Sequence, residues 1–132
     1  MKLTKEQLVD LLCTATYSSD WLECRVLESE SYLDDKFDKE YLENRCREDK
    51  WADRLLNGGK LVCIDYEDQD DEFNPRRYEL VLEDFEIRLE EACKSDDECI
   101  ARSYLNWKFE QSDYYDCNNL VQYVMFGDVI YG

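Results

Sequence analysis

The sequence predicts an α+β fold, with about four to five helices packed on a small, mainly antiparallel sheet. Two observations support this class: apolar residues recur at helical spacing in several segments, and two segments of strand character flank an acidic stretch between residues 60 and 82. A third is composition, because three Trp, ten Tyr and five Phe can fill a core and only four Gly and one Pro interrupt it. We expect a single domain over residues 1–132, since domains of about 100–150 residues are the commonest.

The first helix is predicted from its N-terminal cap. Thr4 and Gln7 have the spacing of a capping box. An apolar stripe at helical spacing follows, formed by Leu8, Leu11, Leu12 and Ala15. We expect this helix to end near residues 15–17, before the Ser-Ser-Asp break at 18–20.

The next two segments differ in how clearly they can be assigned. Residues 21–27 (WLECRVL) fit a strand or a helix, because Leu22 and Val26 satisfy both periods; we favour a strand. Residues 38–56 have helical character, with a break expected near residues 48–49. The Asn-Gly-Gly sequence at 57–59 predicts the helix end.

A hairpin is predicted at residues 60–82. Its strands are KLVCIDY (60–66) and RRYELVL (76–82). Six of the eight residues from Asp65 to Glu72 are carboxylates, so we expect the connection to be a long acidic loop.

Three helices and a short strand are expected after the hairpin, and Asp84 is predicted to cap the first of these helices. That first helix should bury one face, formed by Phe85, Leu89, Ala92 and Cys93. The second, after residues 95–96, carries Ile100, Tyr104, Leu105 and Trp107. The last begins near Asp116 and ends at Gly127, and residues 129–131 are predicted as a terminal strand.

The charge of the chain restricts its partners. The net charge is −17, with 14 acids and 10 bases in residues 1–60 and 19 acids and 6 bases in residues 61–132. Such a field repels nucleic acids and anionic membranes, so we expect neither as a direct partner. It attracts the basic surface of another protein.

The cysteines and the N-terminus indicate a cytoplasmic protein. Seven cysteines make an odd number and include no Cys-x-x-Cys pair, which is not typical of a secreted disulfide framework. The N-terminal segment has acids and no long apolar run, unlike a secretory signal, and no stretch approaches the ~20 apolar residues of a membrane span. We expect reduced, mostly buried thiols.

Several kinds of catalytic or metal site are disfavoured by the residues present. The chain has no histidine, which removes the commonest general base and mixed Cys/His zinc sites. A calcium loop starting at Asp68 would have Glu79 at its twelfth position but Phe73 where the turn glycine belongs. No glycine-rich phosphate motif occurs. We expect no enzymatic activity, no metal and no cofactor.

The acidic residues therefore form the candidate partner-binding surface. Acids at every second position of a helix lie about 3 Å apart along its axis, which approaches the phosphate spacing along one strand of B-DNA, about 3.4 Å. A negative face of this kind fits the basic groove of a nucleic-acid-binding protein, as in antirestriction or nuclease-inhibitor proteins. The expected residues are Asp68, Asp70, Asp71 and Glu72 in the loop, and Glu83, Glu86, Glu90 and Glu91 on the following helix.

Two alternatives stay open beside this acidic binding function. The segment SDYYDCNNLVQYVMF (112–126) has three tyrosines and a phenylalanine, which would suit an adaptor or immunity-type protein that binds one partner through an aromatic patch. The simpler interpretation of that segment, and of Trp51 and Trp107, is core packing. The charge itself would then serve solubility.

Two stretches carry a resemblance to a known group of proteins. They are EDKWADRLLNGGKLVCIDYED (48–68) and NNLVQYVMFGDVIYG (118–132), together less than a third of the chain. They resemble an uncharacterised family of small acidic proteins from gut bacteria and their mobile elements. The resemblance implies a bacterial, intracellular protein with an accessory role in a mobile element, and it brings no catalytic residues.

Overall fold

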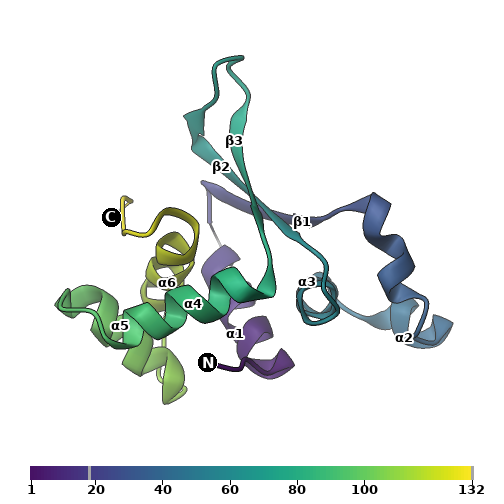
Figure 1. Cartoon of the computed structure of the whole chain (residues 1–132), viewed down its shortest axis with the longest axis horizontal. Coiled ribbons are helices and arrows are strands. Elements are labelled where there is room, and N and C mark those ends of the chain that lie inside the picture. Colours follow the sequence, from purple (N-terminus) through teal and green to yellow (C-terminus); the bar gives the residue numbers. More distant parts are fainter. Residues whose placement is uncertain (18, 132) are drawn as a thin grey trace. The chain divides into compact units, whose positions relative to one another are not determined.

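The computed structural model describes residues 1–17 and 19–131, and it confirms the α+β class. These residues form six α-helices, one 3-10 helix and one three-stranded antiparallel sheet, so the helices outnumber the four to five predicted (Figure 1). The chain groups into two compact units, one made of Met1–Ser19 and Glu83–Gly132 and the other of Asp20–Leu82.

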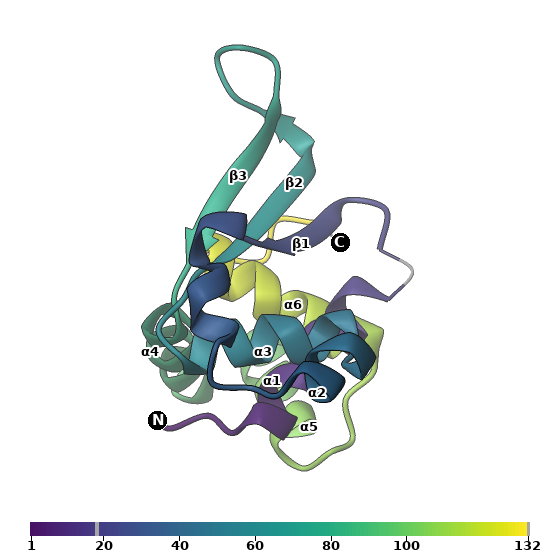
Figure 2. The same ribbon diagram turned by 90° about the vertical axis from the view of Figure 1, so that its right-hand side faces the viewer.

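The unit Asp20–Leu82 contains the sheet. Its strands are β1 (Leu22–Val26), β2 (Leu61–Gln69) and β3 (Pro75–Leu80), in the order β1-β2-β3. This confirms the strand favoured at 21–27 and the hairpin at 60–82. The strand β1 pairs only with residues 61–65 of β2, so the far end of β2 and the start of β3 continue as a two-stranded ribbon (Figures 1 and 2).

Three helices accompany the sheet in this unit. They are η1 (Glu28–Asp34), a 3-10 helix, α2 (Lys39–Asn44) and α3 (Arg47–Leu56), of which α3 packs against β1 and β2. The helical segment breaks at residues 45–46, not at 48–49, because Arg45 and Cys46 adopt extended backbone. The helix η1 was not predicted, since it buries no residue and so has no apolar period.

A buried ionic network explains the position of that break. The guanidinium of Arg45 contacts Asp34 Oδ2 at 2.9 Å and Asp53 Oδ2 at 3.0 Å, and Arg54 contacts Asp34 Oδ2 at 3.1 Å. Tyr41 donates its hydroxyl hydrogen to Asp53 at 2.9 Å, and Arg54 also donates to the carbonyl of Leu27 at 2.7 Å. Two cations and two anions thus balance, as burial of charge requires. Extended backbone at residue 45 lets its side chain turn inward.

The other unit is helical. It contains α1 (Lys5–Thr16), nearly all of α4 (Leu82–Cys93), α5 (Glu98–Lys108) and α6 (Tyr114–Phe126), and α6 packs against both α1 and α5. The capping box of Thr4 and Gln7 is confirmed, with bonds of 3.0 and 3.2 Å. Among the predicted apolar positions of α4 and α5, all are buried except Cys93 and Leu105.

Two predicted helix starts are wrong, by three residues for α4 and by two residues for α6. The helix α4 begins at Leu82, which puts Asp84 in the first turn and not at the cap. The helix α6 begins at Tyr114, where Asp113 accepts from the N–H of Asp116 in a capping box of its own. In both cases a second acid lies near the start, and spacing alone does not say which one caps.

The predicted strand at 129–131 is also wrong, because a side chain takes the place of a partner strand. The buried amide of Gln122 accepts from the backbone N–H groups of Ile130 at 2.9 Å and Tyr131 at 2.8 Å. Its NH2 group donates to the carbonyl of Tyr131 at 3.1 Å. Residues 129–131 are therefore extended chain fixed by α6 and not part of the sheet.

The cysteines differ from the expectation of mostly buried thiols. All seven are free, but only Cys24, Cys63 and Cys117 are buried. Cys24 and Cys63 lie opposite each other on β1 and β2 with their sulfurs 3.8 Å apart. In the described ranges, no helix is both long and apolar enough to span a bilayer.

Candidate functional site

The acidic hairpin is built differently from the long loop that the sequence predicts. Residue 65 of β2 pairs with residue 76 of β3, and residue 69 pairs with residue 75, so three residues of β2 bulge out against none of β3. Arg76 bridges this bulge: its Nε lies 2.7 Å from Asp68 Oδ2, and it also donates to the carbonyl of Gln69 at 2.9 Å. The bond to Arg76 holds the pKa of Asp68 below its ordinary value.

The tip of the hairpin is a short, internally bonded turn. Asp70 closes it through its backbone N–H to the carbonyl of Asn74 at 2.9 Å. The carboxylate of Asp70 accepts from the N–H groups of Glu72 at 2.9 Å and Asn74 at 3.0 Å. The three loop residues 71–73 therefore follow the pattern of a turn that ends in a left-handed residue.

Phe73 occupies that left-handed position. Its φ is +64°, and 81% of its surface is exposed, more than any other large hydrophobic residue described. Glycine or asparagine is the usual choice there, because a Cβ costs about 1–2 kcal/mol in left-handed backbone. A large aromatic side chain at this position gives the fold no packing in return. We name the segment Asp70–Asn74 the hairpin tip.

The four predicted acids of this hairpin therefore fall into two classes. Asp68 is held by Arg76, and Asp70 serves the turn as a hydrogen-bond acceptor. Asp71 and Glu72 are exposed, and no side chain in the described part of the chain pairs with their carboxylates. The free negative charge at the tip thus flanks Phe73 directly.

The four predicted acids on α4 lie in the other unit, and three of them are engaged there. Glu86 accepts from the backbone N–H of Leu3 at 3.3 Å, and Glu90 lies 3.5 Å from the ammonium of Lys94. Glu91 pairs with Arg88 at 3.0 Å and accepts from the hydroxyl of Tyr123 at 3.3 Å. Glu83 is exposed and has no pairing side chain among the described residues.

The aromatic segment 112–126 is mostly packed. Tyr114 accepts from Asn118 at 3.4 Å, Tyr123 donates to Glu91, and Phe126 lies 6.0 Å from Tyr131 between ring centroids. Only Tyr115 is strongly exposed, at 67%. Trp51 and Trp107 are buried, as predicted.

Sequence reasoning missed Phe73 as a candidate residue and used it only as a mismatch to a calcium loop. The available signal was a large apolar residue inside the run DQDDEFN, where turns favour Gly, Asn or Asp. Its backbone angle and exposure follow only from the register of β2 with β3.

The described residues contain no group of three or more His, Cys, Asp or Glu side chains arranged to hold a metal ion. Comparisons with known proteins add no assignment: no family model, no curated protein and no solved structure matches this chain.

Proposed function

We propose that the protein is a non-enzymatic binding protein that docks its hairpin tip on a basic protein surface. The observation that carries this proposal is Phe73, an exposed aromatic residue in costly left-handed backbone between unpaired acids and Asn74. Backbone strain of this kind persists where function requires it. The partner surface has an apolar pocket for the ring, surrounded by Lys or Arg side chains that attract Asp71 and Glu72.

The chemistry of interfaces supports an aromatic anchor with a charged rim. A few buried aromatic or arginine side chains supply most of the binding free energy, while rim charges chiefly raise the association rate. A ribbon that continues beyond β1 also places residues 70–74 at the end of a paired, bulged strand pair. Both features suit insertion into a pocket.

Nucleic-acid mimicry is the competing way in which an acidic surface could bind a basic protein. A mimic needs a row of unpaired carboxylates, and Asp68, Glu86, Glu90 and Glu91 each already have a donor within their own unit. Docking through one aromatic anchor therefore has more support than an imitation of a phosphate row. We place the interaction in the cytoplasm, where exposed thiols such as Cys46 and Cys93 stay reduced.

The test is photo-crosslinking from the tip, in bacterial lysate, at low and high salt. A photoreactive phenylalanine at position 73 should capture one protein, and capture should persist from about 50 mM to about 500 mM salt because an apolar anchor is not screened. Phe73→Asn keeps a residue that tolerates left-handed backbone but removes the ring, so it should abolish co-purification of that protein.

The control is the pair Asp96→Asn and Glu98→Gln, which removes two exposed acids far from the tip in sequence. This variant should bind as the wild type does. Mimicry would instead be established if nucleic-acid enzymes were recovered only at low salt. Their recovery would then be lost when Asp71 and Glu72 are neutralised, but not in Phe73→Asn. Capture that no tip variant changes would overturn the proposal.

A further inference from the structure

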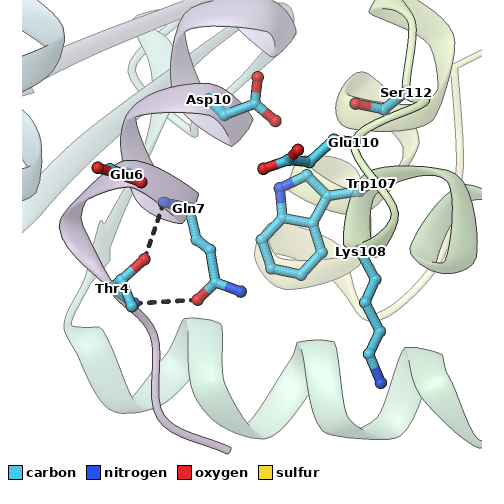
Figure 3. A pocket seen from close by; sticks show the side chains of 8 residues that line it. All are labelled: Thr4, Glu6, Gln7, Asp10, Trp107, Lys108, Glu110 and Ser112. Atoms are coloured by element: carbon cyan, nitrogen blue, oxygen red, sulfur yellow. Dashed lines mark hydrogen bonds between the residues drawn. The ribbon is translucent and has the colours of Figure 1, made fainter.

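A cavity in the helical unit has the features of a ligand site and is independent of the hairpin. It measures about 370 Å³ and lies between the N-terminal half of α1 and the end of α5. Figure 3 shows its lining residues, which are Thr4, Glu6, Gln7, Asp10, Trp107, Lys108, Glu110 and Ser112.

The cavity has an unpaired hydrogen-bond donor in its wall. Trp107 is only 4% exposed, yet within residues 1–17 and 19–131 its indole N–H has no acceptor. Every fully enclosed side-chain nitrogen and oxygen described does have a partner, so this indole nitrogen is not fully enclosed. In Figure 3 the indole nitrogen lies on the side of the ring that faces Asp10 and Glu110.

Two carboxylates approach the same space from different elements. Asp10 projects from α1, and Glu110 follows the end of α5. Partial burial raises the pKa of Asp10, and the negative charge of Glu110 raises it further. The two groups therefore repel each other across the cavity, and a cation between them would remove that repulsion.

Glu110 is held there at a cost in backbone energy. It has a φ of +58° and occupies the residue after the α5 C-cap, where glycine is usual. The N–H of Gln111 donates to the carbonyl of Asn106 at 2.7 Å and that of Glu110 to Trp107 at 3.1 Å, which completes the helix end. Glycine would make the same two bonds, so the helix end does not require a glutamate.

The polar groups of the cavity define what it would bind. A primary ammonium offers N–H donors to both carboxylates. The indole N–H requires an acceptor. The NH2 group of Gln7, which has no acceptor among the described residues and whose oxygen already accepts from Thr4, offers a second donor. A donor in the wall does not suit a bare metal ion, which binds through oxygen or other lone pairs.

We propose that this cavity binds a small primary ammonium compound that has an oxygen acceptor a few bonds away, such as an amino alcohol or a free amino acid. The ammonium lies between Asp10 and Glu110, and the oxygen accepts from the indole N–H of Trp107. Amino alcohols and amino acids share this chemistry and differ only in the charge of the oxygen.

The test follows the indole N–H signal of Trp107 by ¹H–¹⁵N NMR while ethanolamine is added. Trp107→Phe identifies the signal. Probe concentrations up to about 20 mM are needed, since a ligand of so few atoms binds weakly. We expect ethanolamine to cause a saturable shift of this signal. Propylamine, which lacks the oxygen acceptor, and 1-propanol, which lacks the charge, should each bind at least about tenfold more weakly. Glycine tests the amino-acid form.

Charge-removing variants decide whether the carboxylates are the site. Asp10→Asn and Glu110→Gln should each weaken ethanolamine binding about tenfold, the effect of losing one charged hydrogen bond. Glu98→Gln, which changes an exposed acid at the other end of α5, should leave it unchanged, and unchanged remaining signals show that each variant is folded. The proposal would be overturned if Trp107 showed no saturable shift, or if Asp10→Asn and Glu110→Gln bound ethanolamine as tightly as the wild type. Variants of the hairpin tip test the proposed docking on a protein partner, and they should leave ethanolamine binding at the cavity unchanged.

Discussion

At the scale of single residues, Phe73 and Glu110 share an unusual backbone conformation. They are the two non-glycine residues with positive φ in the described part of the chain. Each lies at a place where glycine completes the local hydrogen bonds equally well, the end of a hairpin turn for Phe73 and a helix end for Glu110. Each also presents its side chain to open space. The strain is thus local, and its relief can be measured.

The first prediction concerns that strain. Phe73→Gly should raise the free energy of unfolding by about 0.5–1 kcal/mol, because relief of left-handed strain exceeds the entropy that glycine adds to the unfolded chain. Chemical denaturation measures this difference. The control is Asn74→Gly, whose backbone is not left-handed and which should lower stability. Lower stability in Phe73→Gly would show that the ring contributes packing and would weaken its assignment as a partner anchor.

At the scale of elements, the buried network joins η1, α2 and α3 through side chains. Asp34 receives hydrogen bonds from both Arg45 and Arg54, whose side chains are 4% and 3% exposed. Without the carboxylate of Asp34, the two guanidinium groups lose a shared counterion in a nearly dry environment. The network thus contributes to stability through its completeness, and removal of one member affects all of it.

The second prediction is that Asp34→Ala destabilises the protein by about 3–5 kcal/mol, the usual cost of an unpaired buried charge. Asp35→Ala, a change at the exposed neighbour, should alter stability by less than about 0.5 kcal/mol. Urea denaturation of both variants provides the comparison. Equal effects would show that solvent reaches and compensates the two arginines.

The third prediction is the pH dependence of the same contacts. Burial alone would raise the pKa of Asp34, but hydrogen bonds from Arg54 and Arg45 outweigh it and lower that pKa below the ordinary value of 3.8. Because the folded pKa is the lower one, Asp34 stabilises the fold above the unfolded pKa and loses this effect as the pH falls through the folded one. Stability measured from pH 6 downward to about 2 should therefore fall less steeply in Asp34→Asn than in the wild type. An identical acid profile would contradict this account.

At the scale of the whole molecule, the net charge of −17 opposes folding through self-repulsion. The fourth prediction is that raising KCl from about 10 mM to about 1 M increases the melting temperature, since the screening length falls from about 30 Å to about 3 Å. A gain of about 1 kcal/mol corresponds to roughly 3–5 °C for a chain of this size. Neutralising the exposed acids Asp71, Glu72, Glu83 and Asp96 should reduce that gain. A melting temperature that falls with salt would show that ion pairs outweigh the excess charge.

The sequence by itself determined the α+β class, the start of α1, the two strands of the hairpin and most of the buried helix faces. These depend on capping bonds three residues apart and on apolar periods within one element, both of which are local. The strongly acidic character of the surface was also predictable, from the net charge of the chain.

Only the tertiary structure decided which polar groups meet. Arg45 and Asp34 come together across a helix break, Asp10 and Glu110 meet from opposite ends of the chain, and Gln122 takes the place of a partner strand for residues 130–131. The register of β2 with β3 likewise turned a long acidic loop into a bulge and a tight turn with Phe73 at its tip. The contacts of Arg45 and of Gln122 arise because a buried polar group must find a partner, and which partner is near depends on how distant segments pack.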